Sequence, residues 1–352
     1  MIDTTEKLAT LLQNCRQGNG PPTCAIDTEA DSLHRYRESL CLVQFATRDK
    51  CTLIDPIAID DLAALADYLA PATVWMHGAD YDMTMLKREL GVIPAVVPDT
   101  QIGARLLGLR RFGLADLVSH YFQIELSKSS QKADWGKRPL SEKMVEYALN
   151  DVRYLLEMGD MILAGLREKG RLEWFEESCT AARTKVMERD DSRDESWRIK
   201  GSGKLDPRGL AWLRALWQWR DKEAEAWDRP SFMVVANREM LEWAIKLAGG
   251  GKVQLPRHYR GDRLKRFSKM NEEVRAMPES EWPKRPEKIR RKRDKSFEKK
   301  VNDFLKIRDA KATELEIDPS LIAARAVLEA IAWNETTPEE SLLEWQRECL
   351  GI

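Results

Sequence analysis

The chain has 352 residues, of which 43% are hydrophobic and 33% charged, and its net charge at neutral pH is −1. This length exceeds one typical hydrophobic core, so two or three domains are expected. The acidic first residues lack the pattern of a secretory signal and no apolar run approaches the roughly 20 residues of a membrane span, so we expect a cytoplasmic protein without a membrane segment.

The first 180 residues alternate strand-like and helix-like patterns. The expected elements are a helix at Thr5–Arg16, strands at Thr23–Thr28, Cys41–Ala46 and Cys51–Ile54, a helix near Asp60–Leu69 and a strand at Thr73–Met76. From Asp80 onward the pattern is mainly helical. The short connection between the early strands indicates antiparallel pairing, and the later crossover indicates a parallel neighbour. We therefore expect an α/β fold with a mixed sheet and flanking helices.

Six cysteines are present, with no Cys-x-x-Cys pair and no histidine at zinc-like spacing. Cys24 and Cys41 fall inside apolar strand candidates, and Cys51 begins another. We interpret them as small buried hydrophobic residues in a reducing compartment, without a structural zinc.

The rest of the chain divides into linkers and helical blocks. Residues 181–204 are charged and end in Gly and Ser, which is typical of a linker. A helical block with tryptophans at core-like spacing follows at 205–283, and a second helical block occupies 297–352. A basic linker, 284–296, joins the two. The predicted domains are therefore 1–180, 205–283 and 297–352.

Positive charge is concentrated in the second half. Residues 1–175 carry 20 Lys or Arg against 25 Asp or Glu, whereas residues 252–311 carry 21 against 10. This asymmetry indicates that one part holds a polyanion and another part processes it. Within the basic linker, Arg290, Arg291, Lys292 and Arg293 are candidates to neutralise RNA phosphates. A solvated linker is the alternative interpretation.

Five residues of the first domain form a candidate site. Asp27 and Glu29 are two apart on a strand and so project from one face. Tyr147 and Asp151 are four apart on an expected helix and also share a face, while Asp82 follows another strand. Each acid alone has an ordinary explanation, such as a helix-dipole contact. Four converging carboxylates repel one another unless cations lie between them, and oxygen ligands suit Mg²⁺ or Mn²⁺. The pattern therefore indicates a two-metal phosphodiester hydrolase.

The same segments resemble a known family. Ile26–Glu29, followed by Leu42–Phe45, resembles the first exonuclease motif of the ribonuclease D family. His77–Asp82 and Tyr147–Asp151 resemble its second and third motifs, and the loop Lys128–Leu140 resembles a stretch characteristic of ribonuclease D. The two helical blocks resemble the HRDC domain that helicases share with ribonuclease D.

The resemblance implies a ribonuclease H-like exonuclease domain followed by two small all-α HRDC-like domains. It implies a metal-dependent 3′→5′ exoribonuclease that trims structured RNAs such as tRNA precursors and releases 5′-mononucleotides. By resemblance, Asp27 bridges two divalent metal ions, Glu29 and Asp151 complete one site, and Asp82 supports the other through water. Tyr147 orients the attacking water, because a phenol with a pKa near 10 is a poor base. Glu146 stands where the histidine subclass has its histidine, which favours the tyrosine subclass.

Other features leave alternatives open. Lys128, Gln131 and Arg138 either contact RNA phosphate or tie down their loop. A DNA exonuclease and an inactive RNA-binding relative are the rival functions. Only contacts to the 2′-hydroxyl distinguish RNA from DNA. We expect a monomer whose partner is RNA.

Overall fold

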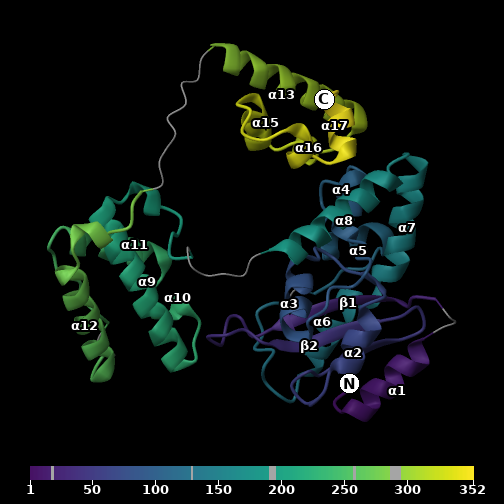
Figure 1. Cartoon of the computed structure of the whole chain (residues 1–352). Helices are drawn as coiled ribbons and strands as arrows, with labels where there is room; N and C mark the ends of the chain where they lie inside the picture. The colour runs from purple at the N-terminus through teal and green to yellow at the C-terminus, as the bar shows by residue number, and fades with distance from the viewer. Residues whose placement is uncertain (17–19, 128–129, 190–195, 257–258, 286–294) are drawn as a thin grey trace. The chain divides into compact units, whose positions relative to one another are not determined.

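The structure is a computed structural model that describes residues 1–16, 20–127, 130–189, 196–256, 259–285 and 295–352. By their contacts these residues form two compact units, coloured along the chain in Figure 1. The first, here called the sheet unit, comprises 1–30, 40–189 and the C-terminal segment from 292. The second, the helical unit, comprises 31–39 and 190–291. None of the helices described is both long enough and apolar enough to cross a lipid bilayer.

A four-stranded mixed sheet forms the centre of the sheet unit. Its strands are β1 (Thr23–Ala30), β2 (Leu40–Ala46), β3 (Cys51–Ile54) and β4 (Thr73–Trp75), in the order β3-β2-β1-β4. β2 pairs antiparallel with both β1 and β3, while β4 joins β1 in parallel. The predicted mixed sheet is confirmed, and the predicted ends of its strands differ from the observed ones by at most two residues.

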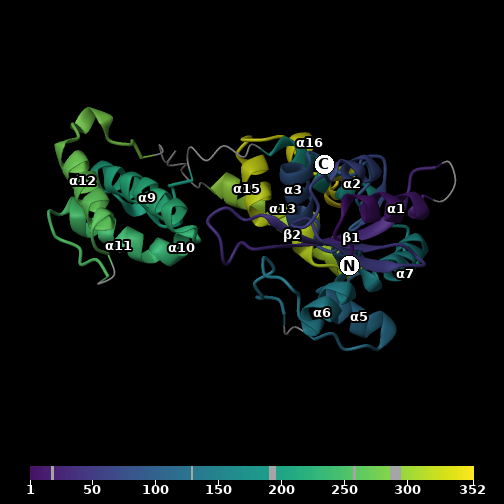
Figure 2. The same ribbon diagram turned by 90° about the horizontal axis from the view of Figure 1, so that it is seen from below.

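Helices cover both faces of this sheet. α1 (Thr5–Cys15), α2 (Ala63–Leu69) and α3 (Asp80–Leu90) pack on the face that carries Ile26 and Phe45. α6 (Glu142–Arg153) packs on the opposite face, where Ala148 contacts Leu42 and Leu53. Figure 2 shows the sheet between these two layers. The remaining helices of this part are α4 (Thr100–Leu106), α5 (Leu114–Phe122), α7 (Leu155–Glu168) and α8 (Leu172–Glu188).

The C-terminal helices belong to the same core. They are α13 (Lys295–Leu315), α14 (Pro319–Ile322), α15 (Arg325–Ala332), α16 (Pro338–Ser341) and α17 (Glu344–Leu350). The buried guanidinium of Arg171 donates to the carbonyl oxygens of Leu106 and Leu315, at 2.7 Å each. Trp174 stacks on Trp345 with ring centroids 5.0 Å apart. Residues from both ends of the chain therefore share one apolar core.

The helical unit is built around aromatic side chains. Its helices are α9 (Pro207–Trp227), α10 (Ser231–Val234), α11 (Asn237–Ala248) and α12 (Asp262–Ala276), with two single 3₁₀ turns at Ser202–Lys204 and Glu279–Glu281. Trp219 and Trp243 are buried in its core, and Trp217 and Trp227 pack against that core. Core packing, predicted for the tryptophans, is confirmed.

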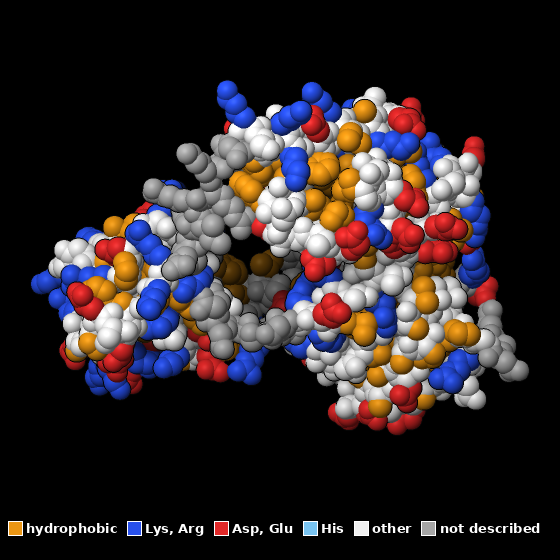
Figure 3. Space-filling view, turned by 45° about the horizontal axis from the view of Figure 1, so that its top comes forward, with side chains coloured by type: hydrophobic (Ala, Val, Ile, Leu, Met, Phe, Trp, Pro, Cys, Tyr) orange, Lys and Arg blue, Asp and Glu red, His pale blue; other side chains and the backbone are white. Residues whose placement is uncertain are grey.

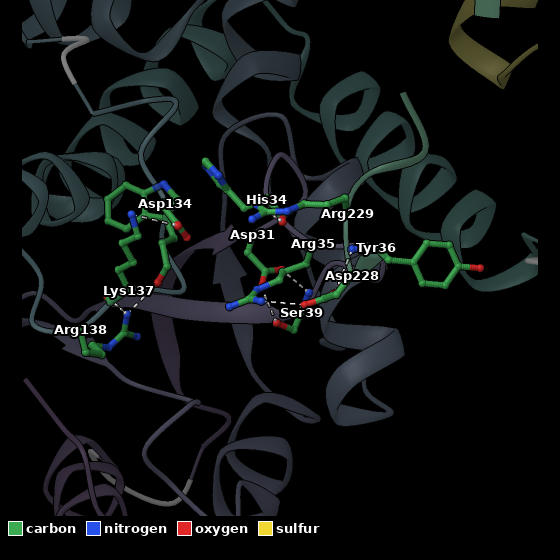
Figure 4. Close-up of polar contacts among 11 residues, drawn as sticks. Asp31, His34, Arg35, Tyr36, Ser39, Asp134, Lys137, Arg138, Asp228 and Arg229 are labelled. Atoms are coloured by element: carbon green, nitrogen blue, oxygen red, sulfur yellow. Dashed lines mark hydrogen bonds and ion pairs between the residues drawn. The ribbon is translucent and has the colours of Figure 1, made fainter. Parts of the chain in front are cut away.

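The loop 31–39, which joins β1 to β2, belongs to the helical unit by its contacts. Figure 4 shows Arg35 and Tyr36 beside Asp228 at the end of α9. The Arg35 guanidinium lies 2.6 Å from the Asp228 carboxylate, and the Tyr36 phenol donates to Asp221 at 2.8 Å.

The domain boundaries expected from the sequence remain a prediction. The structure shows that 295–352 packs on the rest of the sheet unit, through the hydrogen bond from Arg171 to Leu315 and the stacking of Trp345 on Trp174.

None of the six cysteines forms a disulfide. Cys24 and Cys41 are fully buried in their apolar strands as predicted, and Cys179 and Cys349 are buried in helices. Cys15 and Cys51 are only half-buried, which differs from the prediction.

Candidate active site

Three carboxylates meet where β1 ends under α6. Asp27 and Glu29 point to the face of the sheet that α6 covers, and Asp151 comes from the last turn of α6. Each offers an oxygen that lies within 4.8 Å of the others. The ladder between β1 and β2 shifts register between Glu29 and Ala30, so regular pairing ends beside the acids.

Asp82 approaches from the first turn of α3. One of its carboxylate oxygens accepts hydrogen bonds from the backbone amide of Thr28 at 2.9 Å and from the Thr28 hydroxyl at 2.6 Å. Asp82 stands outside the three-acid group, yet its charge raises the pKa of Asp27, Glu29 and Asp151. The structure thus brings three of the four predicted acids into one group and joins Asp82 to Thr28, the residue between Asp27 and Glu29 on β1.

Caps and buried contacts hold the helices that carry these groups. The Ser141 hydroxyl accepts from the Met144 amide and caps the start of α6. α3 follows a turn in which Gly78 has a positive φ of 71°, a conformation that favours glycine. The His77 imidazole lies 2.9 Å from the Thr100 hydroxyl, a contact that ties the strand-to-helix turn to α4.

The site is a cluster of negative charge in which Asp82 is buried and Asp27, Glu29 and Asp151 are half-buried. Burial first, and then the neighbouring acids, raise the pKa of Glu29 to about 8 and that of Asp151 to about 7. The same causes raise the pKa of Asp27 well above its ordinary value. Burial raises the pKa of Asp82 to about 6, against the opposing effect of the Thr28 hydrogen bonds. The ion pairs of the described residues include none of these four acids.

This arrangement fits divalent cations. Like charges crowded in a poorly hydrated site cost free energy, and a bound cation removes that cost. Carboxylate oxygens are the ligands that Mg²⁺ and Mn²⁺ prefer. Asp27, Glu29 and Asp151 are the residues that would hold such an ion.

The Tyr147 phenol belongs to the same cluster. Burial, followed by the charges of Asp151, Glu29 and Asp27, raises its pKa. The phenol therefore stays protonated at neutral pH, so it can donate a hydrogen bond but does not serve as a base. Its ring packs against buried Trp135, with centroids 6.0 Å apart.

Arg138 requires a correction, because the structure uses it to anchor the loop. Its guanidinium makes two hydrogen bonds to the Asp55 carboxylate, at 2.6 and 2.7 Å, and donates to the carbonyl oxygens of Trp135, Lys137 and Cys41. These bonds use all five of its N–H donors. No donor remains for a phosphate, so of the two alternatives the loop anchor describes Arg138. In Figure 4 the neighbouring Lys137 pairs with Asp134.

The structure does not test the other RNA contacts that were predicted from the sequence. Gln131 is exposed and remains a candidate. Lys128 and the basic residues 290–293 lie outside the described residues. On the face drawn in Figure 3, acidic and basic side chains are interspersed over the described surface.

Two polar residues near the acids were given no individual role in the sequence interpretation, although Gln44 lies in the Leu42–Phe45 segment of the first motif. The Asp99 carboxylate accepts from the amides of Gly78 and Ala79, at 2.9 Å each, and so fixes the turn before α3. The sequence feature that could have indicated Asp99 is an Asp-Thr pair at the start of a helical pattern, which is typical of a helix cap. The Gln44 amide lies 3.2 Å from the Asp27 carboxylate. Its signal was a single polar side chain in an apolar strand.

The mixed sheet, the carboxylate cluster and the tyrosine fit a metal-dependent phosphodiester hydrolase. A family profile described as 3′-5′ exonuclease matches residues 1–166. The solved structure of Escherichia coli RNase D superposes with a TM-score of 0.77 at 25% identity and covers 100% of this chain and 96% of its own. A crystallised protein from Bifidobacterium adolescentis gives a TM-score of 0.80 at 25% identity, covering 99% and 94%.

Sequence relatives give the family. Ribonuclease D of Pseudomonas paraeruginosa is 30% identical over 364 aligned positions, which span 97% of this chain and 94% of the relative. Ribonuclease D of Xanthomonas oryzae is 29% identical, over 95% and 92% of the two chains. The chain belongs to the ribonuclease D family and is a 3′→5′ exoribonuclease. The predicted family is confirmed.

Proposed function

We propose that this chain trims the 3′ ends of structured RNAs, such as tRNA precursors, by two-metal hydrolysis that releases 5′-mononucleotides. The supporting observation is the cluster of four acids, which make no ion pair with another described residue. The E. coli relative is described as an exoribonuclease involved in structured RNA processing. We extend that substrate class to this chain because the structural alignment covers 100% of this chain and 96% of the relative.

The proposed ligand roles follow the resemblance. Asp27 would be a ligand of both cations, Glu29 and Asp151 would complete one site, and Asp82 would support the second through water. Two bound Mg²⁺ or Mn²⁺ ions would lower the pKa of the attacking water and stabilise charge on the leaving oxygen. Thr28 restrains Asp82 by two hydrogen bonds to one carboxylate oxygen. The acid is therefore positioned before any ion binds.

Tyr147 would orient the attacking water by hydrogen bonding. Its raised pKa keeps the phenol neutral, and its contact with Trp135 fixes the ring. Arg138 and Asp55 hold the loop that carries Trp135. A chain of packed groups thus connects a buried ion pair to the proposed catalytic phenol.

We further propose that 205–283 and 297–352 are HRDC-like domains. The basic linker 284–296 would raise the local concentration of RNA by neutralising phosphates. Gln131 is the proposed contact from the described part of the loop. A monomeric state and a cytoplasmic location belong to the same proposal.

The variant Asp151→Asn tests the proposed site. Its substrate is a labelled RNA duplex with a single-stranded 3′ tail, supplied with Mn²⁺. We expect nucleotide release to stop while RNA affinity stays equal or improves, because a repulsive charge has been removed. Glu146→Gln on the same helix is the matched control and should keep full activity. Undiminished release by Asp151→Asn would remove the proposed metal site.

Matched RNA and DNA tails test the substrate. We expect faster release from RNA. Equal or faster release from DNA would replace the RNA proposal with a DNA exonuclease.

A further inference from the structure

Gln44 lies in the central strand β2, opposite Asp27 in the antiparallel register. Its side chain is on the α6 face of the sheet and is fully buried, with 0% exposure. The side-chain nitrogen Nε2 donates to the Oδ2 oxygen of Asp27 at 3.2 Å. The amide thus contacts the residue that we place between the two cations.

The surroundings make this amide costly for the fold. All seven residues of β2 are buried, and the other six have apolar side chains or a thiol. Among the described residues, the Gln44 oxygen Oε1 has no hydrogen-bond partner. A buried polar atom without a partner destabilises a fold, and an apolar side chain of similar size avoids that cost. The amide is therefore poorly explained by stability alone.

We propose that Gln44 is a positioning residue, whose amide holds the Asp27 carboxylate in the orientation that binds a divalent cation. This inference rests on the proposed function, because it takes Asp27 as a metal ligand. A hydrogen bond to one carboxylate oxygen limits rotation of the group. Partners of this kind orient metal ligands, and their loss typically weakens metal binding.

Glutamine is suited to this task at this place. A lysine or arginine would pair with Asp27 and compete with the cation, whereas a neutral amide donates a hydrogen bond without charge. A glutamate would add another negative charge to a cluster that already holds four acids. A methionine would keep the length and the burial but lose the donor.

The test is calorimetric titration of Mn²⁺ into metal-stripped protein, with thermal unfolding in EDTA as a second measurement. The variants are Gln44→Met, Gln44→Leu and Asp27→Asn. The matched control is Thr52→Val. It removes a buried polar group from β3 of the same sheet, beside Phe45 and on the opposite face from the acids.

We expect Gln44→Met to weaken Mn²⁺ binding by about 10- to 100-fold. Gln44→Leu, which also lacks the donor, should weaken it to a similar extent, and Thr52→Val should bind like the wild type. Gln44→Met should unfold in EDTA at no lower temperature than the wild type, which separates weaker binding from lost folding. If Gln44→Met does not fold, Gln44→Leu carries the test.

Wild-type Mn²⁺ affinity in the folded Gln44 variants, together with lost binding in Asp27→Asn, would overturn the role of Gln44 and leave the metal site intact. Wild-type affinity in Asp27→Asn would instead overturn the metal site and this inference together.

Discussion

Arg138→Ala is the perturbation whose effect the structure specifies most fully. The substitution removes two hydrogen bonds to Asp55 and three to backbone carbonyls. The Asp55 side chain is only 3% exposed, so its charge is left buried without its partner. Removing one member of a buried pair costs about 3–5 kcal/mol. Because the Arg138 side chain is 23% exposed, we expect the lower end of that range, about 3 kcal/mol.

The assay is thermal unfolding, with Arg48→Ala as the matched control. Arg48 makes a similar two-bond pair with Asp160, at 2.7 and 3.0 Å, but both side chains are more than half exposed. Such a pair contributes under about 1 kcal/mol. Arg138→Ala should therefore lower Tm by about 6–12 °C in a domain of this size. Arg48→Ala should lower it by a few degrees at most.

The same substitution should reduce activity below the unfolding temperature. Trp135 loses its anchor, and its contact with Tyr147 loosens. We expect a lower kcat with little change in Mn²⁺ affinity. Adding Asp55→Ala to Arg138→Ala should recover part of the lost stability, because the orphaned charge is gone. Equal falls in Tm for Arg138→Ala and Arg48→Ala would refute the reasoning.

Three further predictions concern the acids and Tyr147. Asp27→Asn should raise Tm in EDTA while abolishing activity, because one acid of a group of like charges is removed; a lower Tm would count against this. Glu29 and Asp151 have raised pKa values in the folded protein, so above about pH 4 they bind more protons in the folded than in the unfolded state. The stability of the metal-free protein should therefore fall as the pH rises towards about 8. Glu29→Gln should lessen that fall, and identical pH profiles would contradict the expectation. Tyr147→Phe should lower kcat by about 100-fold at unchanged Mn²⁺ affinity; a matching loss of affinity would contradict orientation as its role.

The sequence predicted the sheet well because its strands are short apolar runs with clear ends. Cys51–Ile54 matches the observed β3 at both ends, and Thr23 is the observed start of β1. Local patterns carry little information about packing between distant segments. The attachment of the C-terminal helices depends on Arg171 reaching the carbonyl of Leu315, a contact across 144 positions. No periodicity in either segment indicates that contact.

The acids were predictable because each lies in a motif with a fixed spacing. Their supporting residues were not, since Gln44, Asp55 and Asp99 act through contacts made only in the folded chain. Arg138 shows the same limit. From the sequence alone, a basic residue in a loop before a catalytic helix fits a phosphate contact and a loop anchor equally well. The structure favours the anchor, because Arg138 pairs with the buried carboxylate of Asp55.

Anomalous scattering from a crystal soaked in Mn²⁺ tests the central claim most directly. We predict two peaks, one among Asp27, Glu29 and Asp151 and the second between Asp27 and Asp82. An ordered crystal soaked at saturating Mn²⁺ that shows no peak beside these carboxylates would contradict the metal site.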